Sequence, residues 1–142
     1  MARNTRTVLV VEQEAALRAL LLQALATDGY QVLATGDGKD AVRVGARHEN
    51  EIAVLVTDVI LPGFDGGHLA ELLTLDSPQL KVLYLDSGSA SRTDIERHSH
   101  ALAWDTTIIP LREEDWARTL SRAVRDALRR IEDQPDHTVL NL

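Results

Sequence analysis

The sequence predicts an α/β fold in which a parallel sheet of five strands is packed between helices. Five short apolar runs alternate with five segments that have helical periodicity or helical composition. A strand, a helix and a second strand in succession form a parallel pair joined by a right-handed crossover. The length of 142 residues suits one domain with a substantial core.

The composition is typical of a soluble globular protein, with 44% hydrophobic and 26% charged residues. The chain has no cysteine, which excludes a disulfide framework and thiol chemistry. A net charge of −7 argues against nucleic-acid binding, because that function needs a clustered basic surface. No apolar stretch approaches the roughly 18 to 20 residues of a membrane span, and the basic start runs directly into a strand rather than a signal peptide. We therefore expect a cytoplasmic protein that binds neither nucleic acid nor membrane.

The first half of the chain predicts two strand–helix units. The apolar run Thr7–Val11 is the first strand, and leucines at helical spacing predict a helix over Glu14–Thr27 that ends near Asp28-Gly29. Gln31–Thr35 is a short strand. Glycines break the chain after it, and a helix is expected over Lys39–His48.

The second half begins with the apolar run Val54–Asp58, which ends in an aspartate before Pro62 and Gly63 break the chain. The last helix is the clearest one, because its apolar residues recur at three- and four-residue intervals. After the third strand and a Gly-rich loop, the expected elements are a helix over Gly67–Leu75, a strand over Lys81–Leu85, a polar helix over Arg92–Ser99, a strand over Thr106–Ile109 and a helix over Glu113–Ile131.

Polar side chains follow three of these strands at their carboxyl ends. Glu12 follows the first strand, Asp58 closes the third and Ser87 follows the fourth. Any one of them could simply mark a strand's exit into solvent, but in a parallel sheet all three converge on the edge where open α/β folds bind ligands. Two carboxylates and a hydroxyl suit a hard divalent cation such as Mg²⁺.

These residues resemble the receiver domain of two-component response regulators over roughly residues 6 to 132. The resemblance implies a flavodoxin-like, doubly wound fold with strand order 2-1-3-4-5. It also implies a receiver domain over residues 1–132 and a short C-terminal tail over 133–142. The matching segments are Val10-Val11-Glu12, Asp37-Gly38, Asp58 with Pro62 and Asp65-Gly66, and Ser87-Gly88.

The resemblance assigns a role to each site residue. Asp58 is expected to be the phosphoacceptor, and Ser87 to contact the phosphoryl group. Glu12, Asp58, the backbone carbonyl of Ile60 and, weakly, Gln13 are expected to hold Mg²⁺. The expected partner is a histidine kinase or a phosphotransfer protein. The chain would be a single-turnover phosphoacceptor rather than an enzyme.

Two positions depart from the family pattern. The family has a second acidic residue where this chain has Gln13, and a lysine where it has Ile109 before Pro110. The only lysines are Lys39 and Lys81, and neither is expected near the pocket. The sequence therefore predicts weak or absent Mg²⁺ binding and impaired phosphorylation. By resemblance, the bond between Ile109 and Pro110 is expected to be cis, which costs only about 0.5 to 1 kcal/mol over trans.

Two alternatives to a stand-alone phosphoacceptor stay open at this point. A degenerate receiver would act as a phosphorylation-independent adaptor for a kinase or another receiver, and Gln13 and Ile109 favour this class. A flavodoxin-like cofactor binder would share the architecture, because fold alone does not give function. The sequence Glu12-Gln13-Glu14 argues against it, since these carboxylates would repel a phosphate.

The last helix carries five arginines beside its apolar residues, at positions 118, 122, 125, 129 and 130. This pattern predicts an acidic partner or a homodimer through the last strand and helix, although a solvated face explains the same pattern. Trp104 and Tyr84 are candidates for a signalling aromatic, but a place in the core is the preferred interpretation for both.

Overall fold

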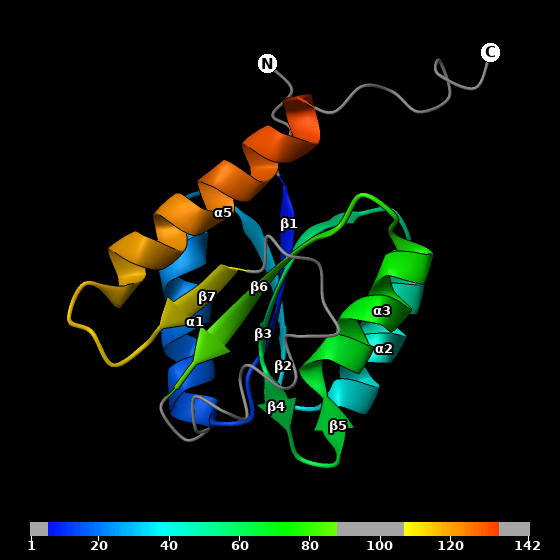
Figure 1. Cartoon of the computed structure of the whole chain (residues 1–142), viewed down its shortest axis with the longest axis horizontal. Coiled ribbons are helices and arrows are strands. Elements are labelled where there is room, and N and C mark those ends of the chain that lie inside the picture. The colour runs from blue at the N-terminus through cyan, green and yellow to red at the C-terminus, as the bar shows by residue number, and fades with distance from the viewer. Residues whose placement is uncertain (1–5, 88–106, 134–142) are drawn as a thin grey trace.

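A computed structural model describes residues 6–87 and 107–133. Its main sheet is parallel and has the order β2-β1-β3-β6-β7, which in chain order of the five strands is the predicted 2-1-3-4-5 (Figure 1). The doubly wound fold class is confirmed. The strands are β1 (Thr7–Val11), β2 (Gln31–Thr35), β3 (Ile52–Asp58), β6 (Lys81–Asp86) and β7 (Thr107–Pro110).

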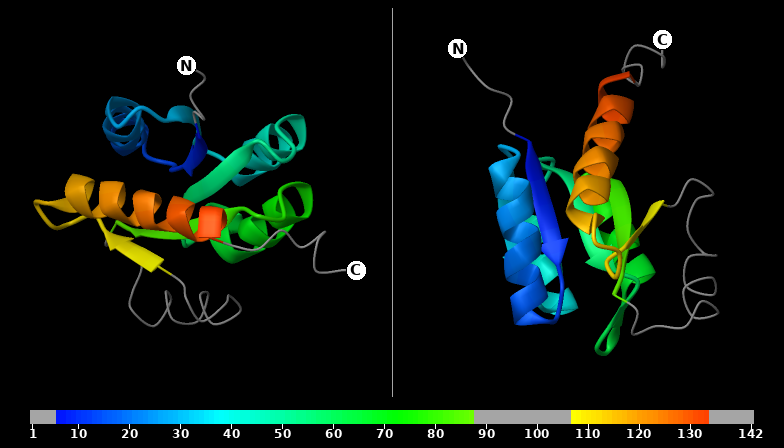
Figure 2. Two further views of the ribbon diagram at one scale, coloured as in Figure 1. Left: turned by 90° about the horizontal axis from the view of Figure 1, so that it is seen from above. Right: turned by 90° about the vertical axis from the view of Figure 1, so that its left-hand side faces the viewer.

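Helices cover both faces of this sheet, as Figures 1 and 2 show. Helices α1 (Ala15–Thr27) and α5 (Trp116–Asp133) lie on one face, and α2 (Gly38–Arg47) and α3 (Gly66–Asp76) lie on the other. No helix in residues 6–87 and 107–133 has both the length and the apolar character needed to cross a membrane.

The alternation of side chains along β1 divides the core into two layers. Val8 and Val10 pack with the α1 and α5 side, whereas Leu9 and Val11 pack with the α2 and α3 side. All four side chains are fully buried. Because successive strand residues point to opposite faces, an unbroken apolar run is what a strand covered by helices on both sides requires. The expected core position of Tyr84 is also confirmed, since its side chain is 2% exposed.

Several details differ from the sequence-based expectations. The segment after Asp58 is an antiparallel hairpin of β4 (Ile60–Leu61) and β5 (Phe64–Asp65) rather than an irregular loop. Gly63 has a φ of 65° at the turn between them, a conformation that glycine adopts without steric cost. The last helix begins at Trp116, three residues later than expected. The expected helix over 92–99 and Trp104 lie outside the described residues.

The predicted cis bond before Pro110 is wrong. No peptide bond of the described residues is cis, so the bond between Ile109 and Pro110 is trans. Strand β7 continues through the proline, because Pro110 pairs with Asp86, and the N–H of Leu111 donates to the carbonyl of Asp86 at 2.9 Å. This extended pairing with β6 is the structural context in which the trans bond occurs.

Candidate functional site

The structure brings the predicted site residues to one edge of the sheet. Glu12 follows β1, Asp58 is the last residue of β3, and Ser87 follows β6. The register pairs Val11 with Thr57, so Glu12 and Asp58 lie one step beyond neighbouring positions on adjacent strands. Convergence at the carboxyl edge is thus observed, while the chemical roles of these residues stay predictions.

The carboxyl groups of Glu12 and Asp58 are buried and incompletely paired. The two residues are 2% and 6% exposed, and Glu12 Oε2 and Asp58 Oδ1 have no hydrogen-bond partner. Burial, a side-chain hydrogen bond with Glu12 and the charge of Glu12 together raise the pKa of Asp58 to about 9, while a backbone hydrogen bond from Gln13 opposes the rise. Two buried carboxylates side by side favour either a retained proton or a bound cation.

The oxygen-rich edge fits a divalent cation, but with an incomplete ligand set. The unpaired oxygens of Glu12 and Asp58 are the hard donors that Mg²⁺ takes. Gln13 is exposed and can add only a neutral amide oxygen. In the part of the chain that the structure describes, no three His, Cys, Asp or Glu side chains are grouped as a metal site would need.

The other predicted site residues lie around this acidic pair. Ile60 is in β4, two residues beyond Asp58, and its side chain is 38% exposed. Ser87 is half-buried directly after β6. Ile109 is 1% exposed and packs in the core with Leu83 and Leu120. The position where the family carries a lysine is therefore filled by apolar packing.

The backbone of Asp58 and Val59 leaves no room for a side chain at Gly66. A Cβ on this glycine would overlap the backbone carbonyl oxygens of Asp58 and Val59, and the Gly66 N–H donates to the Val59 carbonyl at 2.9 Å. Asp65 caps α3 by accepting from the N–H groups of Gly67 at 2.6 Å and His68 at 3.4 Å. These contacts fix the hairpin and the start of α3 against the end of β3.

Sequence reasoning missed Arg18 as a residue that contacts the acidic turn. Its guanidinium Nη1 donates to the carbonyl of Glu12 at 2.9 Å and lies 3.5 Å from the carbonyl of Gln13. The only sequence signal is a basic residue four positions after Glu14 on a helix, which predicts an ordinary surface ion pair. The folded chain instead turns this side chain back onto the backbone.

Comparison with known proteins establishes the family. Residues 8–116 match the family described as the response regulator receiver domain. This chain belongs to that family. The family assignment and the coarse role in two-component signalling therefore agree with the sequence-based interpretation.

Two curated relatives illustrate how far the sequence likeness of this receiver extends. It is 34% identical over 84 residues to the probable transcriptional regulatory protein TcrX of Mycobacterium tuberculosis, an alignment that covers 59% of this chain and 35% of that protein. It is 29% identical over 85 residues to the response regulator receiver protein CpdR of Brucella abortus, covering 60% of this chain and 69% of that protein. The chain thus spans about a third of the first of these relatives.

Solved structures show the same fold. The receiver domain of the hybrid histidine kinase CckA superimposes with a TM-score of 0.69 at 27% identity, covering 86% of this chain and 98% of that chain. A response regulator receiver domain from Clostridium thermocellum gives a TM-score of 0.76 at 21% identity, covering 89% and 97% of the two chains. At 21% identity, the similarity to the Clostridium thermocellum domain shows a shared fold and nothing more.

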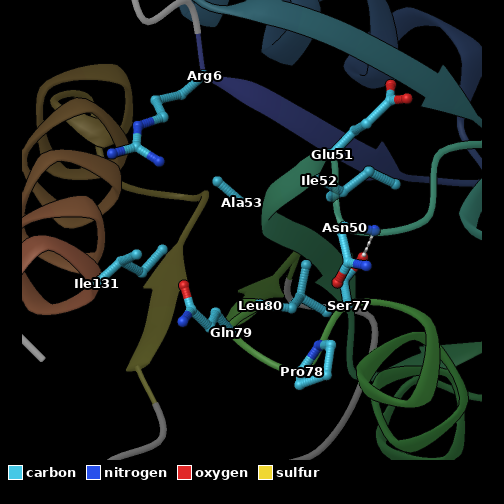
Figure 3. A pocket seen from close by; sticks show the side chains of 10 residues that line it. All are labelled: Arg6, Asn50, Glu51, Ile52, Ala53, Ser77, Pro78, Gln79, Leu80 and Ile131. Atoms are coloured by element: carbon cyan, nitrogen blue, oxygen red, sulfur yellow. Dashed lines mark hydrogen bonds between the residues drawn. The ribbon is translucent and has the colours of Figure 1, made fainter. Parts of the chain in front are cut away.

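A cavity of about 390 Å³ lies at the opposite edge of the sheet, where β3 and β6 begin (Figure 3). Arg6, Glu51 and Ile131 are among its lining residues. The N–H of Asn50 donates to Ser77 Oγ at 3.0 Å there. Since Glu12 and Asp58 lie at the carboxyl ends of the strands, this cavity is not part of the acidic site.

Proposed function

We propose that this receiver accepts a phosphoryl group on Asp58 from a phosphohistidine of a histidine kinase or phosphotransfer protein, and that it does so inefficiently. The observation that carries the proposal is the buried pair of Glu12 and Asp58 at the carboxyl edge of the sheet, each with an unpaired oxygen. An isolated structural carboxylate would be exposed or fully hydrogen-bonded instead.

In the proposed reaction, a carboxylate oxygen of Asp58 attacks the phosphorus of the phosphohistidine. The new P–O bond makes an acyl phosphate, the P–N bond breaks, and its electron pair returns to the imidazole, which then takes up a proton. Asp58 has to be ionised for this attack, although in the metal-free chain burial and Glu12 raise its pKa to about 9. Ser87 is the proposed hydrogen-bond donor to the transferred group.

Glu12 and Asp58 would hold the divalent cation through their carboxylates, with the Ile60 carbonyl and Gln13 as neutral ligands. When bound, the cation supplies positive charge that favours the ionised form of Asp58 and offsets the charge of the phosphoryl oxygens. The remaining ligands would be waters, as is usual for Mg²⁺.

The proposed impairment rests on Gln13 and Ile109. Gln13 gives the site one negative charge fewer than an acidic residue would. Ile109 places an apolar side chain, 1% exposed, where the family has an ammonium group. Lys81 cannot replace it, because it begins β6 at the other edge of the sheet. Phosphoryl transfer depends chiefly on positioning and charge neutralisation, so losing a charged ligand and a phosphate contact should slow it.

The direct test is the intact mass of the chain after incubation with a small phosphodonor and Mg²⁺. We expect slow, partial addition of one phosphoryl group to the unmodified chain, and none to Asp58→Asn. Fast stoichiometric addition would contradict the impairment, and addition to Asp58→Asn would contradict the assignment of Asp58.

A phosphorylation-independent adaptor is the second candidate, and the same two residues favour it. It predicts that the chain binds a kinase or another receiver with equal affinity whether or not Asp58 is replaced by Asn. If no phosphoryl group is added at any Mg²⁺ concentration and this binding is unchanged, the adaptor role replaces the phosphoacceptor role.

A further inference from the structure

Arg18 connects helix α1 to the turn that carries the acidic site. Its guanidinium donates to the carbonyl of Glu12 at 2.9 Å, and the N–H of Glu12 donates to the carbonyl of Thr35 at 3.0 Å. The backbone of Glu12 is therefore held on its carbonyl side by α1 and on its amide side by the end of β2. A charged donor makes the first of these bonds stronger than a neutral one would.

Gly36 provides the space in which the guanidinium lies. A Cβ on Gly36 would overlap Arg18 Nη1 and would stand 3.4 Å from the Glu12 carbonyl oxygen. The group that it meets is the far end of a flexible side chain, so an alanine should displace the arginine without unfolding the chain. This gives a way to move the guanidinium from the turn while leaving its charge in the protein.

The side chain that this backbone carries is the buried Glu12 carboxyl group. Glu12 is 2% exposed, and only a long contact of 3.4 Å, from the N–H of Glu14 to Oε1, supports its carboxyl group from within the turn. The carboxylate's position therefore depends on where the backbone of residues 12–14 is held. Outer contacts of this kind commonly set the affinity of a metal site.

We propose that Arg18 is a positioning residue that fixes the turn after β1, so that the Glu12 carboxylate faces Asp58 in the geometry needed for a divalent cation, and that the absence of a side chain at Gly36 leaves the space for its guanidinium. This inference rests on the proposed role of Glu12 and Asp58 as cation ligands. Arg18 acts through the backbone of Glu12 and does not itself touch the cation or the phosphoryl group.

The test measures the Mg²⁺ dissociation constant by calorimetry and, in metal-free protein, the amide hydrogen exchange of residues 12–14. Arg18→Ala should weaken Mg²⁺ binding by about 10-fold and speed the exchange of these amides. Arg18→Lys should recover part of both losses, because lysine keeps one charged donor but lacks the planar fork of arginine. Gly36→Ala should reproduce the direction of both changes with no change in net charge.

Arg43→Ala is the matched control. Arg43 lies on the exposed side of α2 and pairs with Asp40 at 2.9 Å, so its loss removes the same charge away from the turn. This variant should keep the unmodified dissociation constant and exchange rates. A purely structural role for Arg18 would lower the resistance to urea without changing either readout at temperatures well below unfolding.

Wild-type values for Arg18→Ala and Gly36→Ala in both readouts would overturn the inference. If the unmodified chain binds no Mg²⁺, the proposed cation site is wrong, and the exchange measurement alone decides about Arg18. Faster exchange in both variants would then still support its positioning role, and unchanged exchange would overturn it.

Discussion

Asp58 is stable in its buried position because the folded chain can keep the carboxyl group protonated. Its neighbour Glu12 is also buried, and one oxygen of each group lacks a partner. An ionised carboxylate in that setting would lose its water without gaining full compensation from the protein. The buried carboxyl groups of the proposed site therefore lower the stability of the metal-free protein.

The cost of ionising the buried Asp58 carboxyl group predicts that the stability of the protein depends on pH. The pKa of Asp58 is about 9 in the folded chain, raised from an ordinary value of 3.8. Between these two values the unfolded chain releases the proton while the folded chain keeps it, so the contribution of Asp58 to stability falls as pH rises from about 4 towards 9. Asp58→Asn should therefore stabilise the metal-free protein by about 1 to 3 kcal/mol near neutral pH, and less at pH values near 4.

Urea unfolding in the presence of a chelator, at several pH values, measures this difference. Asp126→Asn is a suitable control, because Asp126 is exposed on α5. Equal effects of the two substitutions, or an Asp58→Asn effect that does not grow with pH, would contradict the explanation.

A second prediction at the residue scale concerns the two departures from the family pattern. Gln13→Asp combined with Ile109→Lys should speed phosphoryl addition to Asp58 more than either change alone, because both added charges act on the same phosphoryl group. Ile109 is 1% exposed, so lysine there also carries a desolvation cost, and urea unfolding must show that the variant is folded. Labelling rates no faster than those of the unmodified chain would show that other features limit the reaction.

Helix α5 shows how one element serves the core and a surface at once. Leu120, Val124 and Ala127 are fully buried against the sheet. Arg118 and Arg122 are exposed on the same helix. A cavity of about 440 Å³ lies between α5 and β7, lined by Arg122 and by Ile108, whose side chain is 36% exposed. We call the surface of Ile108, Arg118 and Arg122 the α5–β7 surface.

If the α5–β7 surface binds an acidic partner or a second copy of this chain, charge reversal at Arg118 and Arg122 should weaken that association. The effect should shrink as salt is added, because screening already reduces the attraction. Sedimentation and partner-binding measurements at low and high salt test this, with Arg43→Glu and Arg47→Glu on α2 as the control. Unchanged association would mean that these arginines are simply a solvated face.

At the scale of the whole molecule, cation binding and folding are linked. A cation that binds only the folded chain adds RT ln(1 + [Mg²⁺]/Kd) to its stability. At about 10 mM Mg²⁺, a Kd of about 10 mM adds only about 0.4 kcal/mol, whereas a Kd of about 0.1 mM adds about 2.7 kcal/mol.

We therefore expect Mg²⁺ to raise the unfolding temperature of the unmodified chain by about 1 °C, and of Gln13→Asp by several degrees. Differential scanning calorimetry with and without Mg²⁺ measures both shifts. The carboxylate added by Gln13→Asp should also destabilise the metal-free protein. Measurements without Mg²⁺ therefore give its effect on folding, and the shift on adding Mg²⁺ gives its effect on binding. A large shift for the unmodified chain would show that Gln13 does not weaken the site.

The sequence by itself determined the fold class and the edge of the sheet at which Glu12, Asp58 and Ser87 converge. The unbroken apolar run at residues 8–11 is typical of a strand that is buried on both faces, as in a parallel sheet covered by helices. The polar residues that end these runs then have to meet at one edge, because parallel strands share a direction. These inferences succeed because each apolar run and the polar residue that ends it are neighbours in the chain, and parallel pairing then gives every run the same direction.

The tertiary structure alone decided the features that depend on contacts between distant segments. Burial raises the pKa of Asp58, and Glu12, which follows a different strand, raises it further; the trans bond before Pro110 occurs where β7 pairs with β6. Arg18 has the pattern of a surface residue, yet its position depends on the open space beside Gly36. Local sequence patterns do not predict such neighbours. The burial, the nearby charges and the free space at a residue are set by the segments that fold against it.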